Sequence, residues 1–261
     1  MKDRSLFISI LLFFHLALSV SVGLLLEGEI PLRLGTAAAL LLPVLLLSHS
    51  PSPSARLHFA PKAHAYLFLL LLPLFVLTTA GVSIGTGELF RRLGLPVSGA
   101  TPLDSLPMAI LFDALLPAVC EELFCRGALF AVLRPMGRRT AILFSAALFA
   151  FMHGSPAQLP YAFLAGVLLA LLYELTGSLL FPILFHFANN LVSLLLIFGA
   201  PPVLVFTLLG GIAALGLLLF CLCARRAGLV LPEEEEEAPV RELLLSPSVA
   251  YLAIMALLLV L

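Results

Sequence analysis

The chain alternates long apolar runs with short polar segments, and this alternation limits the possible folds more than any other feature of the sequence. Of its 261 residues, 62% are hydrophobic and 11% are charged, whereas a soluble domain is about 45–50% apolar and about 25% charged. A helix that crosses a bilayer needs about 20 apolar residues. The sequence therefore predicts an all-α fold, a polytopic transmembrane bundle of about eight helices.

The lengths of the apolar runs place these helices. We expect them at 6–26, 32–48, 64–85, 106–133, 140–153, 158–175, 178–198 and 202–224. The segment 86–105 mixes charged residues with Gly and Pro, which favours a short interfacial helix. The apolar stretch 248–261 is short for a span and is either an interfacial helix or part of a tilted one. Residues 6–26 follow two basic residues but lack a small-residue cleavage site, which favours a retained helix over a signal peptide.

Basic residues set the expected orientation. With a cytoplasmic N-terminus, 10 Lys and Arg residues fall on the cytoplasmic side and 3 on the other, which is a positive-inside bias. The first group is Lys2, Arg4, Arg56, Lys62, Arg134, Arg138, Arg139, Arg225, Arg226 and Arg241; the second is Arg33, Arg91 and Arg92. We therefore expect a multi-pass protein of a bacterial inner membrane, in contact with the lipid bilayer. The net charge of −1 gives no indication of nucleic-acid binding.

Two adjacent acids and an arginine interrupt the fourth apolar run: Glu121, Glu122 and Arg126. Each such group costs about 2.5–3.5 kcal/mol near the centre of a membrane helix, so the three need a partner or a polar cavity. Glu122 and Arg126 are four residues apart and share a helix face, so we expect them to pair. Glu121 points about 100° away and is expected to face a cavity, where a desolvated Glu can act as a general base. Pro117 removes a helix hydrogen bond and is expected to bend this helix.

Later apolar runs contain two further polar motifs. His153 ends one helix, with Phe149 one turn earlier as a packing residue, and His186 and Asn190 lie one turn apart on one face of another. An imidazole and a carboxamide on one ridge can both donate to a developing negative charge, as in an oxyanion hole. Interhelical hydrogen bonding is the alternative role for His186 and Asn190. Asn189 is a weaker candidate because it faces elsewhere.

Helix geometry places these motifs at similar depths. At 1.5 Å per residue, Glu121, His153 and Asn190 lie about 18, 20 and 18 Å from the cytoplasmic ends of their helices, and His186 lies about 12 Å. The sequence therefore predicts an intramembrane polar cavity that contains two acids, two imidazoles and an amide. Asp113 and Glu174, near helix ends, are weaker candidates that could flank a substrate path.

Two chemistries are open for these residues. Glu121, His153 and His186 could hold Zn²⁺ or another divalent metal, since zinc accepts imidazole and carboxylate ligands, although the zincin motif HExxH is absent. Alternatively, the glutamate activates water directly. The four cysteines, Cys120, Cys125, Cys221 and Cys223, lie in apolar stretches without a CxxC motif, and we expect buried thiols.

The order EExxxR, FxxxH and HxxxN, each in its own apolar segment, resembles the CPBP family of intramembrane proteases. That family includes the type II CAAX prenyl endopeptidases and bacterial Abi proteins. The resemblance covers about 106–200, which divides the chain into N-terminal helices (1–105), a catalytic core (106–200) and a C-terminal part (201–261) with a helix, the acidic run 233–237 and the short apolar segment.

The resemblance implies a helical core with a conical cavity and hydrolysis of a peptide bond in a membrane-associated protein or peptide. It implies that Glu121 activates water with help from His153. It also implies that His186 and Asn190 stabilise the oxyanion, while Glu122 supports the site with Arg126. The family has been described both as metal-dependent and as glutamate-dependent, and a prenylated CAAX substrate is not implied for bacterial members.

Two other functions remain as alternatives. One is a non-catalytic membrane scaffold or bacteriocin-immunity factor with the same fold, for which apolar helices and an acidic loop would suffice. The other is an ion-coupled transporter, since intramembrane Glu and His can relay protons. The sequence shows no inverted repeat and no paired broken helices, which makes the transporter the weaker of the two.

Overall fold

The computed structural model describes residues 2–47, 65–97 and 101–223. In this part of the chain there are eight helices and no strands, so the predicted all-α bundle is confirmed. Seven of the helices are α1 (Lys2–Leu25), α2 (Glu29–Leu47), α3 (Ala65–Arg92), α7 (Arg138–Met152), α8 (Leu159–Thr176), α9 (Leu180–Ile197) and α10 (Pro202–Cys223). The predicted segment 248–261 and the acidic run 233–237 lie outside the described residues.

The remaining helix runs from residue 106 to 136 and changes its winding along its length. It consists of α4 (Leu106–Ala109), a π-helical stretch (Ile110–Leu115), α5 (Leu116–Glu122), a second π-helical stretch (Leu123–Leu129), α6 (Phe130–Leu133) and a 3-10 turn (Arg134–Met136). Pro117 has no main-chain N–H to donate, and it lies two residues after Leu115, where the first π-helical stretch ends. Such stretches occur often at functional sites. Glu121 and Glu122 end α5, at the start of the second stretch.

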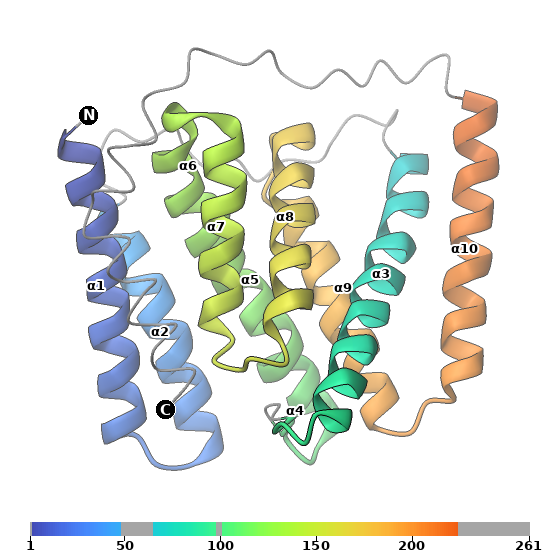
Figure 1. The fold of residues 1–261 in the computed structure, drawn as a ribbon, viewed down its shortest axis with the longest axis horizontal. Coiled ribbons are helices and arrows are strands. Elements are labelled where there is room, and N and C mark those ends of the chain that lie inside the picture. The colour runs from blue at the N-terminus through green and yellow to red at the C-terminus, as the bar shows by residue number, and fades with distance from the viewer. Residues whose placement is uncertain (1, 48–64, 98–100, 224–261) are drawn as a thin grey trace.

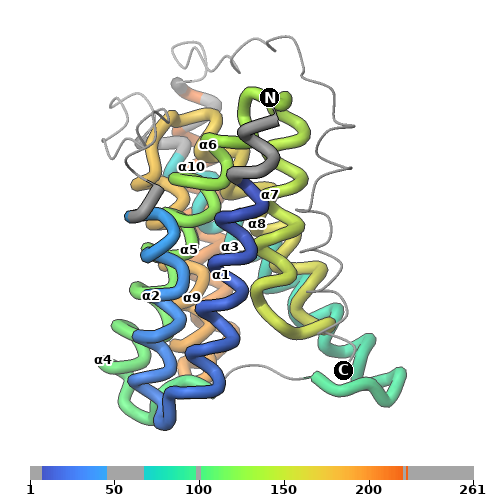
Figure 2. The backbone as a smooth tube through the Cα atoms, turned by 90° about the vertical axis from the view of Figure 1, so that its left-hand side faces the viewer, coloured from blue at the N-terminus to red at the C-terminus, as the bar shows by residue number. Residues whose placement is uncertain are grey.

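The helices run up and down between two ends of the bundle (Figures 1 and 2). We call the end that contains the N-terminus and residues 134–139 the basic end; it is uppermost in Figure 1. We call the opposite end the cavity end; the α1–α2 turn and α4 lie there. α7 packs against α8, α1 against α2, and α10 against α3.

Among the described residues, five helices contain stretches that are long and apolar enough to span a membrane. These are Ile8–Leu25, Phe68–Arg92, Leu159–Thr176, Leu180–Ile197 and Pro202–Leu219. Large apolar side chains on α10 are exposed, with Leu208, Leu215 and Leu222 among them. An apolar exposed surface on long helices is what a lipid environment requires, and the protein is a membrane protein.

The segment 86–105 differs from the expectation of a separate interfacial helix. α3 continues to Arg92 without a break, seven residues beyond the predicted end. Glu88 pairs with Arg91 and with Arg92, three and four residues later on the same helix face. These pairs favour continuation of the helix through charged residues that hydropathy alone assigns to a loop.

α7 is shorter than a bilayer is thick. Its 15 residues extend about 22 Å, compared with about 30 Å for a hydrocarbon core. The turn after α7 therefore ends at the depth of the membrane, where irregular backbone is tolerated only against protein or a water-filled cavity. His153 lies at this end of α7, next to the cavity described below.

We expect Gly166→Ala to destabilise the bundle by about 1–3 kcal/mol. A Cβ on Gly166 of α8 would lie 2.8 Å from Ala146 Cα of α7, which is main chain and cannot turn aside. The measurement is thermal unfolding of the detergent-solubilised protein. The matched control is Gly81→Ala in α3, where no atom lies within 4 Å of the new Cβ, and the alanine should leave the protein equally stable or slightly more stable. Equal behaviour of the two variants would contradict this packing.

Candidate active site

The core of the site is the ion pair between Glu122 and Arg126, which is present as expected. Arg126 Nη1 donates to Glu122 Oε1 at 2.8 Å, and both side chains are 0% exposed. Arg126 Nη2 donates to the main-chain oxygen of Gly166 at 2.7 Å, and its guanidinium carbon lies 4.9 Å from the centre of the Phe149 ring. The arginine therefore joins the helix of the two acids to both α7 and α8.

His186 connects α9 to the same carboxylate. Its Nδ1 lies 3.0 Å from Glu122 Oε1, and its Nε2 lies 3.9 Å from Glu121 Oε2. An ionised Glu122 can only accept, so Nδ1 is the donor in this bond. The second nitrogen, Nε2, is then directed towards Glu121. Nε2 donates there when it carries a proton and accepts when it does not.

The two adjacent acids lie in different environments. Glu122 is fully buried and paired, whereas the Glu121 side chain is 21% exposed and lines a cavity of about 1060 Å³. Arg126 bonds Glu122 and not Glu121. Two carboxyl groups with different surroundings can take different roles, which is how many hydrolases separate a structural acid from a reactive one.

His153 faces the cavity from the end of α7. Its Nδ1 lies 2.8 Å from the main-chain oxygen of Phe149, which can only accept, so Nδ1 donates and Nε2 is left for the cavity. The Phe149 ring lies between the two histidines, with ring centres 4.9 Å from His153 and 5.4 Å from His186. Phe149 is therefore a packing residue that separates and orients the two imidazoles.

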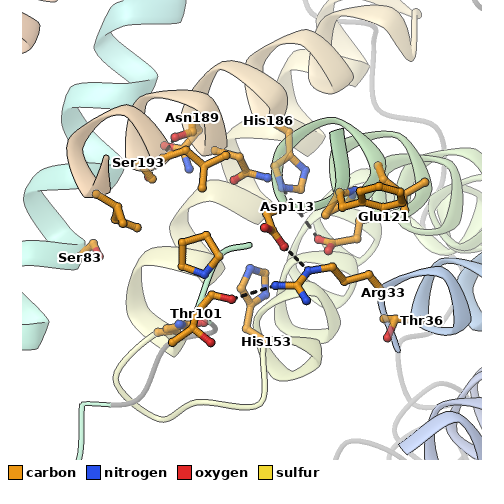
Figure 3. A pocket seen from close by; sticks show the side chains of 18 of the residues that line it. Arg33, Thr36, Ser83, Thr101, Asp113, Glu121, His153, His186, Asn189 and Ser193 are labelled. Atoms are coloured by element: carbon orange, nitrogen blue, oxygen red, sulfur yellow. Dashed lines mark hydrogen bonds and ion pairs between the residues drawn. The ribbon is translucent and has the colours of Figure 1, made fainter. Parts of the chain in front are cut away.

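The predicted residues of all three motifs are brought to one place. Glu121, His153, His186 and Asn190 all line the cavity, and Glu122 and Arg126 lie directly behind its wall. Figure 3 shows Glu121, His153 and His186 directed into the same space. Asn189 also lines the cavity, and its Oδ1 lies 2.7 Å from Thr79 Oγ1 of α3. The prediction that Asn189 faces elsewhere is therefore wrong, because α3 borders the cavity on that side.

One cluster in the cavity was not predicted from the sequence. Arg33 of α2 donates from Nε to Asp113 at 2.5 Å and from Nη2 to the main-chain oxygen of Thr101 at 2.9 Å (Figure 3). Asp113 in turn accepts from the main-chain nitrogen of Leu103 at 2.9 Å. Asp113 was among the weaker candidates from the sequence, and it lines the cavity. Its pairing with Arg33 was not predicted. Glu174 pairs with Arg134 at 2.7 Å and does not line the cavity.

The donor set of a metal site is not assembled in the described residues. No group of three or more His, Cys, Asp or Glu side chains there is placed to hold a metal ion. Glu121 and His186 approach each other, but His153 does not complete a three-ligand set with them. Cys120 and Cys125 are buried free thiols, as predicted. The side chains of Cys221 and Cys223 lie outside the description.

Comparison with known families agrees with the motifs. Residues 103–192 match the family model described as type II CAAX prenyl endopeptidase Rce1-like. The resemblance predicted from the sequence is confirmed over this segment, which is about a third of the chain and contains every motif of the site. No curated protein and no solved structure matches the chain. The segment therefore has the sequence pattern of an endopeptidase family.

We expect Arg126→Met to lower the free energy of unfolding by about 3–5 kcal/mol, because it leaves a buried carboxylate without its cation. Adding Glu122→Gln should recover part of this loss, since the double variant has no uncompensated charge. A double-mutant cycle on chemical unfolding in detergent measures both effects. Arg92→Met removes an arginine whose side chain is 76% exposed, and its effect should stay below about 1 kcal/mol. A loss for Arg126→Met as small as this would contradict the assigned pairing.

Proposed function

We propose that this protein is an intramembrane endopeptidase that hydrolyses a peptide bond in a membrane-associated protein or peptide. The observation that supports this most directly is that the two adjacent acids lie in different environments. Glu122 is buried and neutralised by Arg126, whereas Glu121 faces the cavity beside His186. The endopeptidase family pattern over 103–192 supports the same reaction class.

Glu121 is the proposed general base. The 3.9 Å between Glu121 Oε2 and His186 Nε2 is too long for a direct hydrogen bond. A water molecule can bridge polar groups at such a separation. In the proposed reaction, this water gives a proton to the Glu121 carboxylate as its oxygen attacks the scissile carbonyl carbon. The proton then passes to the leaving amine, and His153 assists from the other side of the cavity.

Asn190 and His186 are the proposed oxyanion donors. Asn190 can donate from its amide nitrogen in any state. His186 Nδ1 already donates to Glu122, so Nε2 donates to the oxyanion only when the imidazole holds a second proton. Before the attack, the protonated His186 and Arg126 would balance the negative charges of Glu121 and Glu122. After Glu121 has taken the proton of the water, they would balance the oxyanion and Glu122. This requirement couples the oxyanion site to the buried ion pair.

A metal-bound water is the second candidate for the nucleophile. The described residues do not converge as a three-ligand set, so the proposed nucleophile is water activated by Glu121. Dialysis of the purified protein against a chelator separates the two chemistries. Retained activity favours water activated by Glu121. Loss that Zn²⁺ restores favours a metal held by Glu121, His153 and His186.

The proposed substrate is a short unfolded stretch of a polypeptide at the membrane. A cavity of about 1060 Å³ lies just above the range of about 300–1,000 Å³ for small-ligand sites, so it admits a peptide segment and no folded domain. The proposed location is the cell membrane of a bacterium, with a cytoplasmic N-terminus. The proposed substrate is not required to be a prenylated CAAX protein.

We expect Glu121→Gln to reduce proteolysis by about 10²–10⁴-fold, the usual contribution of a general base. The measurement maps new protein termini in membranes from cells that make the wild-type chain or the variant at equal levels. Termini found only with wild type identify the substrate. Glu174→Gln is the matched control, because it neutralises a buried glutamate that does not line the cavity. Identical termini from wild type and Glu121→Gln, with both proteins folded, would favour the scaffold or immunity function.

We expect Asn190→Ala to lower kcat by about 10²–10³-fold, the usual loss for one oxyanion donor, with a smaller change in KM. A synthetic peptide around the mapped cleavage site provides the assay. Ser193→Ala, one turn closer to the cavity end on α9, is the control and should have nearly wild-type kcat. An effect of Asn190→Ala on KM alone would assign this residue to substrate binding and remove it from the oxyanion site.

A further inference from the structure

The cavity occupies one half of the bundle only. Along α2 no lining residue lies beyond Leu40, and along α3 none lies before Thr79. Along the helix 106–136 none lies beyond Glu121, and along α9 none lies before His186. Because neighbouring helices run in opposite directions, these limits all fall near mid-depth. The lining continues from there to Glu29 in the α1–α2 turn region and to Thr101, both at the cavity end.

The other half of the bundle is closed. Beyond Glu121 towards the basic end, the same helix is filled by fully buried residues, among them Phe124, Leu129, Phe130 and Leu133. Phe185, immediately before His186, is also buried, and it joins these residues in one hydrophobic core. Glu121 and His186 therefore form the floor of a cavity whose open side is the cavity end.

Basic residues mark the closed end as the cytoplasmic one. Lys2, Arg4, Arg134, Arg138 and Arg139 lie there. At the cavity end Arg33 pairs with Asp113, and Arg91 and Arg92 both pair with Glu88. Excess Lys and Arg on the cytoplasmic side is the general rule for membrane proteins.

The rim of the cavity is apolar and exposed. Ile84 on α3 and Ile197 on α9 line the cavity and are 59% and 62% exposed. Leu32 and Val97 also line it and are exposed. The polar groups lie deeper, with Thr79 and Asn189 on the way to His186. Exposed apolar side chains at a mouth in the bilayer favour the approach of a chain that is itself in contact with lipid.

We infer that the substrate enters from the extracytoplasmic side of the membrane. Its class is an exported polypeptide that stays at the membrane, or the extracytoplasmic end of a transmembrane segment, and not a protein anchored on the cytoplasmic face. The substrate class in this inference rests on the proposed function. The side on which the cavity opens is inferred only from the distribution of basic residues and the position of the cavity.

The side is tested by thiol labelling, which does not depend on activity. Thr101→Cys places a thiol at the cavity mouth, and Arg139→Cys is the matched control at an exposed position of the basic end. Both are made in a chain with the four native cysteines replaced by alanine. A membrane-impermeant maleimide is added to intact spheroplasts and, separately, to lysed ones. We expect Thr101→Cys to react in both preparations and Arg139→Cys only after lysis.

The reverse pattern, with Arg139→Cys reactive in intact spheroplasts and Thr101→Cys protected, would overturn the inference. If the cysteine-free chain fails to fold, the same two substitutions in the otherwise native chain, each compared with the unsubstituted chain, give the same reading. Once a substrate is mapped, labelling Thr101→Cys in intact spheroplasts should reduce its cleavage at least tenfold. Correct labelling sides without any proteolysis would contradict the proposed function but leave the side of the opening established.

Discussion

The bond between Arg126 and Glu122 is the interaction on which the rest of the site depends. Both groups are completely buried, and the arginine also binds the main chain of α8 and lies over the Phe149 ring of α7. The glutamate in turn holds His186 of α9. The carboxylate of Glu122 and the guanidinium of Arg126 thereby connect their own helix to α7, α8 and α9. Removing a partner from such a pair costs far more than the pair itself contributes.

This pair also explains why Glu121 remains available. Arg126 is already bonded to Glu122 and to the main-chain oxygen of Gly166, so it does not engage Glu121 as well. Glu121 lies on the neighbouring face, where the space below the short helix α7 admits water. The geometry of the site therefore follows from two features: the rotation of about 100° between adjacent helix positions, and a helix that ends before it crosses the bilayer.

Much of this arrangement follows from the sequence. The helices follow from run length, and the Glu122–Arg126 pair follows from their spacing of four residues. The contact between His186 and Glu122 joins residues 64 positions apart, and it depends on how α9 packs, which no local pattern reveals. The same is true of Arg33 and Asp113, 80 positions apart. Pro117 predicted a bend in its helix. The two π-helical stretches of that helix could not be predicted from the sequence and were found only in the structure. The continuation of α3 to Arg92 was missed because hydropathy ignores charge pairs within a helix.

For the proposed endopeptidase, the depth of Glu121 limits where a substrate can be cut. From Glu121 to the start of α4 at Leu106 is 15 helical residues, about 22 Å. An extended peptide covers about 3.3 Å per residue, so about seven residues separate the cavity end, at the start of α4, from the floor of the cavity. In the proposed reaction, a peptide bond would reach Glu121 at a fixed number of residues from the cavity end, whatever the side chains in between.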